Sequence, residues 1–91
     1  MTLEEKIRDR EIVYNFQGDL AVATELALLY YIMAKRKNIR EQIAEACYRA
    51  VYWLKRARVE IPEYIEQLSC YGQLDEIEKL IVEAKVNICP A

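Results

Sequence analysis

Aromatic and cationic side chains gather in the middle of the chain, where they offer the chemistry of recognition. The stretch CYRAVYWLKRAR, residues 47–58, holds Tyr48, Arg49, Tyr52, Trp53, Lys55, Arg56 and Arg58. Aromatic rings next to cations can stack on bases, bind phosphates or anchor a protein interface. On a helical wheel of residues 39–58, Trp53 falls at the apolar edge, so we expect it to pack in the core.

Tyr48 and Tyr52 fall on the opposite side of this wheel, four residues apart and among charged residues that include Glu41 and Glu45. Two explanations fit this position. Another helix of the same domain could cover the two rings. Alternatively, the rings are exposed beside arginine, a composition enriched at protein interfaces. The second explanation predicts a partner-binding surface that consists of Tyr48, Arg49, Tyr52, Lys55 and Arg56.

The residues that catalysis or metal binding would need are scarce. The chain has no histidine, so the common Ser–His and Cys–His pairs cannot form. Its three aliphatic hydroxyls, at Thr2, Thr24 and Ser69, stand outside any recognisable motif. Metal sites usually need closely spaced cysteine or histidine pairs, and a phosphate-binding loop needs clustered glycines. Neither pattern occurs, so we expect no catalytic, cofactor or metal site and a protein that is not an enzyme.

Two further features are ambiguous. Glu25 lies in an apolar segment, so it either sits at the edge of the buried face and reaches water, which we expect, or pairs with a cation such as Arg49. The three cysteines, Cys47, Cys70 and Cys89, fit ordinary buried thiols. Their odd number also permits one internal disulfide with one thiol left over, or a disulfide between chains. The abundance of Glu, Lys, Arg and Ile resembles heat-adapted proteins, in which intracellular disulfides occur.

The net charge of -2 hides three blocks of different sign. Residues 1–34 carry six acids and three bases, residues 35–58 eight bases and two acids, and residues 59–91 seven acids and two bases. We expect these blocks to neutralise one another across the fold or to keep it soluble. A free-standing DNA-binding protein would be basic overall, so we expect contact with nucleic acid to be weak or indirect at most.

The chain shows no secretory signal, and its one long apolar run, residues 20–34, is shorter than the roughly 20 residues that cross a membrane. We therefore expect a cytoplasmic location without a membrane partner. The length of 91 residues and the apolar fraction of 54% predict a single folded domain, residues 1–91.

Helical periodicity and capping signals predict an all-α fold. A first helix of about residues 3–17, with Leu3, Ile7, Val13, Tyr14 and Phe16, begins with the Thr2–Glu5 capping pattern and ends at Gly18. Asp19 caps a second, nearly all-apolar helix of about 20–37, and Asn38 caps a third of about 39–58. These two form a central antiparallel hairpin.

The rest of the chain completes a bundle of four or five helices. Pro62 opens a fourth segment, with Tyr64, Ile65, Leu68 and Tyr71 on its inner side, and Gly72 interrupts it. Asp75 caps a last helix that buries Ile77, Ile81 and Ala84.

Together these features favour a non-enzymatic accessory subunit or adaptor that binds and stabilises a larger intracellular protein assembly, in a setting that handles nucleic acid, such as a replication or transcription machine. Two alternatives remain open. One is a homodimer that pairs through the first or third helix, with a regulatory or viral role. The other is a weak nucleic-acid binder that uses the basic 35–58 segment, including Lys35, Arg36, Lys37 and Arg40.

Overall fold

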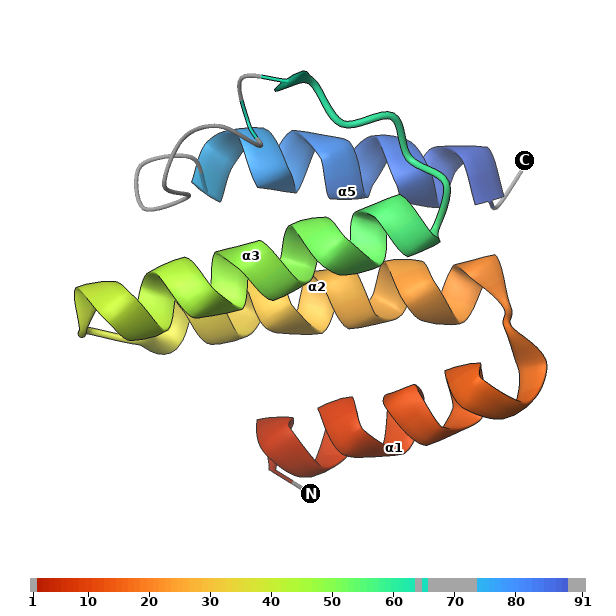
Figure 1. Cartoon of the computed structure of the whole chain (residues 1–91), viewed down its shortest axis with the longest axis horizontal. Helices are drawn as coiled ribbons and strands as arrows, with labels where there is room; N and C mark the ends of the chain where they lie inside the picture. The colour runs from red at the N-terminus through yellow and green to blue at the C-terminus, as the bar shows by residue number, and fades with distance from the viewer. Residues whose placement is uncertain (1, 64, 66–73, 89–91) are drawn as a thin grey trace.

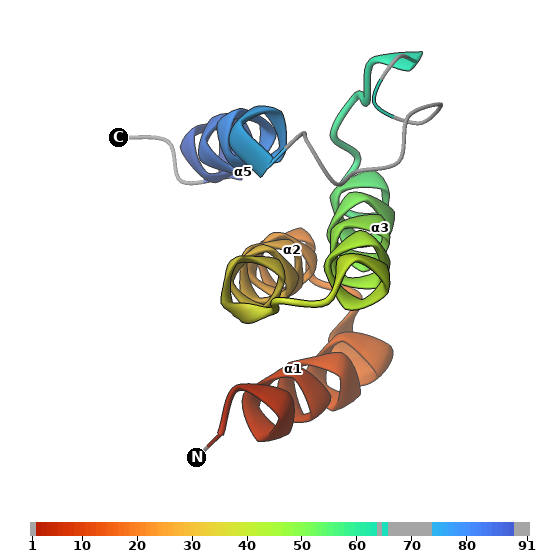
Figure 2. The ribbon, with the colours of Figure 1, turned by 90° about the vertical axis from the view of Figure 1, so that its left-hand side faces the viewer.

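Four helices make up the fold in the part of the chain that the computed structural model describes, which is residues 2–63, 65 and 74–88. They are α1 (Leu3–Gln17), α2 (Leu20–Arg36), α3 (Arg40–Arg56) and α5 (Leu74–Ile88). The antiparallel pair α2 and α3 forms the middle layer, with α1 on one side and α5 on the other (Figures 1 and 2). The predicted all-α bundle around a central antiparallel hairpin is confirmed.

The first two helices begin and end where local signals predict. The Thr2 hydroxyl accepts a hydrogen bond from the backbone N–H of Glu5 at 3.1 Å, which caps α1. Gly18 ends α1 with φ at +61°, in the left-handed region that glycine adopts without strain. The Asp19 carboxylate then accepts from the N–H two residues further on, at 2.8 Å, and caps α2.

The start of α3 differs from the prediction. Asn38 does not cap this helix, because the residue at the cap position is Ile39, whose carbonyl accepts the first helical hydrogen bond from Ile43 at 3.0 Å. An isoleucine side chain has no acceptor, so α3 begins without a side-chain cap. The α2–α3 connection is so short that the hairpin geometry, rather than the best local cap, sets where α3 begins.

The end of α3 also differs, since the helix stops at Arg56 instead of continuing to residue 58 or 59. Arg58 has φ at +64°, in the left-handed region. The N–H of Val59 donates to the carbonyl of Leu54 and that of Arg58 to Lys55, both at 3.0 Å. This pair of bonds is a Schellman motif, which usually has glycine at the position of Arg58. The last helical carbonyls are thus satisfied, but with a non-glycine residue in a strained conformation.

The last helix, α5, begins at Leu74, so Asp75 lies within its first turn and is not its cap. A carboxylate there still interacts favourably with the helix dipole. The predicted inner face of α5 is confirmed, because Ile77, Ile81 and Ala84 are buried. Ile65 of the predicted fourth segment is buried as well. The other features predicted for that segment, at Tyr64, Leu68, Tyr71 and Gly72, lie outside the described residues.

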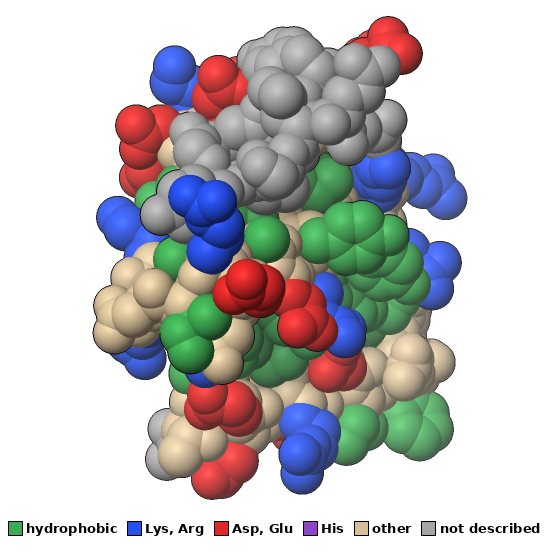
Figure 3. Space-filling model, turned by 60° about the vertical axis from the view of Figure 1, so that its left-hand side comes forward, with side chains coloured by type: hydrophobic (Ala, Val, Ile, Leu, Met, Phe, Trp, Pro, Cys, Tyr) green, Lys and Arg blue, Asp and Glu red, His purple; other side chains and the backbone are tan. Residues whose placement is uncertain are grey.

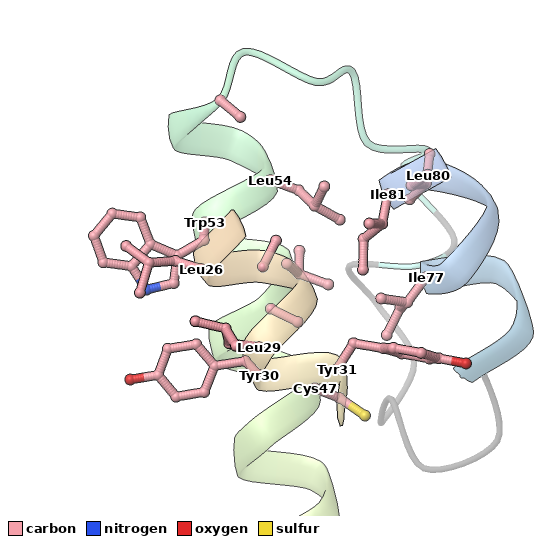
Figure 4. Close-up of a cluster of buried hydrophobic side chains, with 14 of the residues drawn as sticks. Leu26, Leu29, Tyr30, Tyr31, Cys47, Trp53, Leu54, Ile77, Leu80 and Ile81 are labelled. Carbon is pink, nitrogen blue, oxygen red and sulfur yellow. The ribbon is translucent and has the colours of Figure 1, made fainter. Parts of the chain in front are cut away.

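The core is centred on α2, which touches all three other helices. Eight of its seventeen residues are buried, and small ones such as Ala23 and Ala27 let α3 approach closely. Leu54 of α3 meets Ile77 and Ile81 of α5 in the same cluster (Figure 4). Cys47 is a fully buried core residue, as expected, while Cys70 and Cys89 lie outside the described residues.

Two adjacent tyrosines of α2 link it to the outer layers. Tyr30 and Tyr31 extend to opposite sides of the hairpin (Figure 4). The Tyr30 hydroxyl donates to Glu11 of α1 at 3.4 Å, and the Tyr31 hydroxyl donates to Glu78 of α5 at 2.9 Å. Burial raises the pKa of both phenols, and the neighbouring carboxylates raise it further. Both rings are therefore hydrogen-bond donors that hold α1 and α5 against the hairpin.

No helix in the described part of the chain is both long enough and apolar enough to cross a membrane.

Candidate functional site

The exposed face of α3 is the candidate site, and we call it the α3 strip. It consists of Glu41, Glu45, Tyr48, Arg49, Tyr52, Lys55 and Arg56, all of them exposed. Tyr48 is 72% exposed and Tyr52 is 44% exposed, so none of the four described helices covers them. In Figure 3, hydrophobic and cationic side chains lie next to each other at the right-hand edge of the molecule, on the side that α3 forms. Of the two explanations for the tyrosine pair, exposure is the one that the structure supports.

The helical period of α3 fixes this outward direction. Cys47, Val51 and Leu54 point into the core and anchor α3 against α2 and α5. Residues four apart share one side of a helix, so burying these side chains turns Tyr48 and Tyr52 to the opposite side. The same packing places the two rings above one another along the helix.

Tyr52 belongs to a cluster that connects α3 with α1. Its ring meets Trp53 edge to face, with ring centres 5.3 Å apart, and Trp53 meets Tyr14 of α1 in the same way at 5.1 Å. The Arg56 guanidinium lies over both tyrosine rings, 5.5 Å from the centre of Tyr52 and 5.8 Å from that of Tyr14. Trp53 is 7% exposed and is a core residue, as predicted. Tyr52 is thus held in place from the side, whereas none of these ring contacts involves Tyr48.

The N-terminal half of the α3 strip is acidic, and its C-terminal half is basic. Glu45 forms an ion pair with Arg49 at 3.3 Å, one helical turn apart, and this contact raises the pKa of Arg49. Beyond the tyrosines, Lys55 and Arg56 carry the positive charge. Glu41 and Glu45 were predicted to lie on this face but not to be site residues, because a role for them depends on the order of charges along an exposed helix.

The cations of the basic 35–58 segment are exposed, except Lys37, which is half-buried. The segment does not form one continuous surface, because Lys35, Arg36 and Arg40 lie around the α2–α3 turn and Lys55 and Arg56 lie at the far end of α3. Tyr31 links this segment to the acidic last helix, because its ring lies 5.6 Å from the Lys35 ammonium and its hydroxyl donates to Glu78.

A second apolar pair is exposed on α1. Phe16 is 87% exposed and Ile12, one turn earlier, is exposed as well, while Ile7 and Tyr14 of the same helix pack inward. Phe16 is one of the apolar residues predicted for this helix, but it does not contribute to the core. Because α1 has apolar residues on both sides, its pattern alone does not show which side packs.

Glu25 lies at the edge of the buried face, as expected. Its side chain is 39% exposed and forms an ion pair with Arg10 of α1 at 3.6 Å, so Arg49 is not its partner. Arg10 also binds Asp9 at 2.8 Å. Within residues 2–63, 65 and 74–88, no three acidic, cysteine or histidine side chains lie close enough together to hold a metal ion.

Comparison with known proteins gave no match to a family model, to a curated protein or to a solved structure.

Proposed function

We propose that the protein is a non-enzymatic accessory subunit that binds and stabilises a larger intracellular protein through the α3 strip. The observation that carries this proposal is the exposed pair Tyr48 and Tyr52, flanked by Arg49, Lys55 and Arg56. Tyrosine and arginine are enriched at the centres of protein interfaces, because they bury large surfaces while still forming hydrogen bonds. A solvent-exposed ring such as Tyr48 gains this stabilisation only when a partner covers it.

The rigidity of the α3 strip also supports this role. Its side chains come from a helix that is anchored on its other side by the core, and Tyr52 is held between Trp53 and Arg56. Binding therefore requires little ordering of the backbone, which reduces the entropy lost in the complex.

The proposed setting is an assembly that handles nucleic acid, such as a replication or transcription machine. The cations at the two ends of α3 could contact phosphates there, although the chain is acidic overall. Direct and independent nucleic-acid binding is a weaker candidate, since the basic residues are divided between two ends and the intervening Arg49 is paired with Glu45.

A comparative pull-down tests the proposal. The tagged wild-type chain and a Tyr48→Ala variant are each used to capture partners from a nuclease-treated extract of the source organism, and the captured proteins are quantified by mass spectrometry. We expect one larger protein, in stoichiometric amount, with the wild type and at least a tenfold loss with the variant. Val82→Ala is the matched control, because Val82 is an exposed apolar residue on α5.

Three outcomes oppose the proposal. Capture of no larger protein contradicts it, and equal capture by the wild type and Tyr48→Ala shows that the α3 strip is not the binding surface. Partners captured from an untreated extract but not from the nuclease-treated one would instead favour a nucleic-acid binder.

A further inference from the structure

The α3 strip carries its charges in an order that makes it complementary to itself. Along the helix, Glu41 and Glu45 come first, Tyr48 and Tyr52 occupy the middle, and Lys55 and Arg56 come last. The strip runs for about 22 Å, from its first acid to its last base. Among the described residues, neither Glu41 nor Arg56 has an ion-pair partner. An acidic end and a basic end are therefore both exposed on one straight surface.

We propose that a second copy of this chain binds to the α3 strip, with the two α3 helices antiparallel about a twofold axis. If Tyr48 of one copy faces Tyr52 of the other, Glu45 faces Lys55 at the same register. Arg56 then lies within side-chain reach of the partner copy's acidic end. The four aromatic rings meet at the axis, and opposite charges meet at both ends.

Charge order excludes the parallel arrangement. In a parallel pair, Glu41 and Glu45 would face Glu41 and Glu45 of the second copy, and Lys55 and Arg56 would face Lys55 and Arg56. Like charges would then meet at both ends. The antiparallel arrangement also has twofold symmetry, because each contact occurs twice. Such an interface closes as a dimer and does not continue into a filament.

The dimer is expected to be weak, because the contact area is small. A standard stable interface buries about 800 Å² on each partner, and one face of a seventeen-residue helix provides less than that. We expect a dissociation constant on the order of 10–100 µM, with monomers at low concentration. The i,i+4 ion pair between Glu45 and Arg49 is exposed and would reorganise at little cost when Glu45 meets a cation of the second copy.

This arrangement would regulate the surface that the proposed function uses. Two copies that cover each other's tyrosines hide the α3 strip, so a larger partner must displace the second copy before it can bind. This consequence rests on the proposed function, but the dimer itself does not, and the two are tested separately.

Sedimentation velocity over 1–500 µM, combined with charge reversal, tests the dimer. Reversing the acidic end with Glu41→Lys and Glu45→Lys gives a strip that is basic at both ends. Reversing the basic end with Lys55→Glu and Arg56→Glu gives a strip that is acidic at both ends, with Arg49 as its remaining cation. We expect the wild type to dimerise, each reversed variant alone to dimerise at least tenfold more weakly, and an equimolar mixture of the two to recover dimers. Far-UV circular dichroism verifies that both variants are folded.

The outcomes separate this inference from the proposed function. A wild type that stays monomeric at 500 µM, or a mixture of folded variants that fails to associate, overturns the dimer and leaves the pull-down result unaffected. Dimers that persist in both reversed variants, or that are lost in Phe16→Ser, place the interface elsewhere and also overturn it. Wild-type dimers with equal capture of the larger protein by the wild type and Tyr48→Ala would support the dimer while contradicting the proposed function.

Discussion

Removing the three aromatic side chains at the end of α3 one at a time should destabilise the fold to very different extents. Trp53 is almost completely buried and contacts two rings edge to face. Replacing such a residue by alanine usually costs about 3–5 kcal/mol, and each aromatic pair adds about 0.5–1.5 kcal/mol to what simple burial provides. A domain of this size has a free energy of unfolding of roughly 5–14 kcal/mol, so Trp53→Ala should be left barely stable.

Tyr52 and Tyr48 should follow in order of decreasing effect. Tyr52→Ala removes one edge-to-face pair and the stacking of Arg56, which predicts a loss of about 1–2 kcal/mol. Tyr48→Ala removes an exposed ring, so the change should stay within about 0.5 kcal/mol. For a domain of this length, 1 kcal/mol corresponds to about 4–8 °C in Tm. Tyr48→Ala is therefore the variant that tests binding without a loss of folding.

Urea unfolding followed by far-UV circular dichroism measures all three variants, since this signal does not depend on the single tryptophan. The reasoning is refuted if Tyr48→Ala destabilises the chain as much as Trp53→Ala does. That result would show Tyr48 to be part of the core. A loss below about 1 kcal/mol for Trp53→Ala would likewise contradict the assigned packing.

Three further predictions concern the backbone and the buried phenols. Arg58→Gly should raise the free energy of unfolding by about 0.5–1 kcal/mol, since glycine relieves the left-handed strain, and a lower Tm would contradict this. Gly18→Ala should cost about 1 kcal/mol although the added methyl group meets nothing, so an unchanged urea midpoint would argue against the left-handed cap. Burial, and after it the Glu11 carboxylate, raises the pKa of Tyr30. The protonated phenol therefore stabilises the fold fully below about pH 10, and this stabilisation is lost as the pH rises through the folded-state pKa. The Tm of the wild type should therefore fall more steeply between pH 9 and 11 than that of Tyr30→Phe. The exposed Tyr48→Phe is the control and should behave like the wild type. Equal slopes for the wild type and Tyr30→Phe would contradict the prediction.

Those parts of the fold that local interactions determine could be predicted from the sequence. The caps at Thr2 and Asp19 and the left-handed Gly18 each depend on residues within four positions, so their patterns are readable. The ends of α3 depend instead on distant packing. A short hairpin places Ile39 rather than Asn38 at the cap. The partly buried Val59, which packs against the core, supports a turn that puts arginine at a glycine position.

The candidate site could be predicted only in part, because it depends on both local periodicity and distant packing. The helical period alone separates Tyr48 and Tyr52 from the buried face of α3. Their exposure depends on where α1 and α5 pack, and so does the stacking of Arg56 on Tyr14, which lies more than forty residues away in sequence. Because α1 is apolar on both sides, its sequence does not show that the side with Phe16 is the exposed one.

Site-specific crosslinking can show whether the α3 strip binds other proteins. A photoreactive phenylalanine analogue replaces Tyr48 in one variant and Val82 of α5 in a control variant, both exposed positions, and each is irradiated in cells of the source organism. We expect position 48 to crosslink to one larger protein, with a minor product from the second copy of the chain, and position 82 to give neither product. The same products from both positions, or no product from position 48, would contradict this expectation.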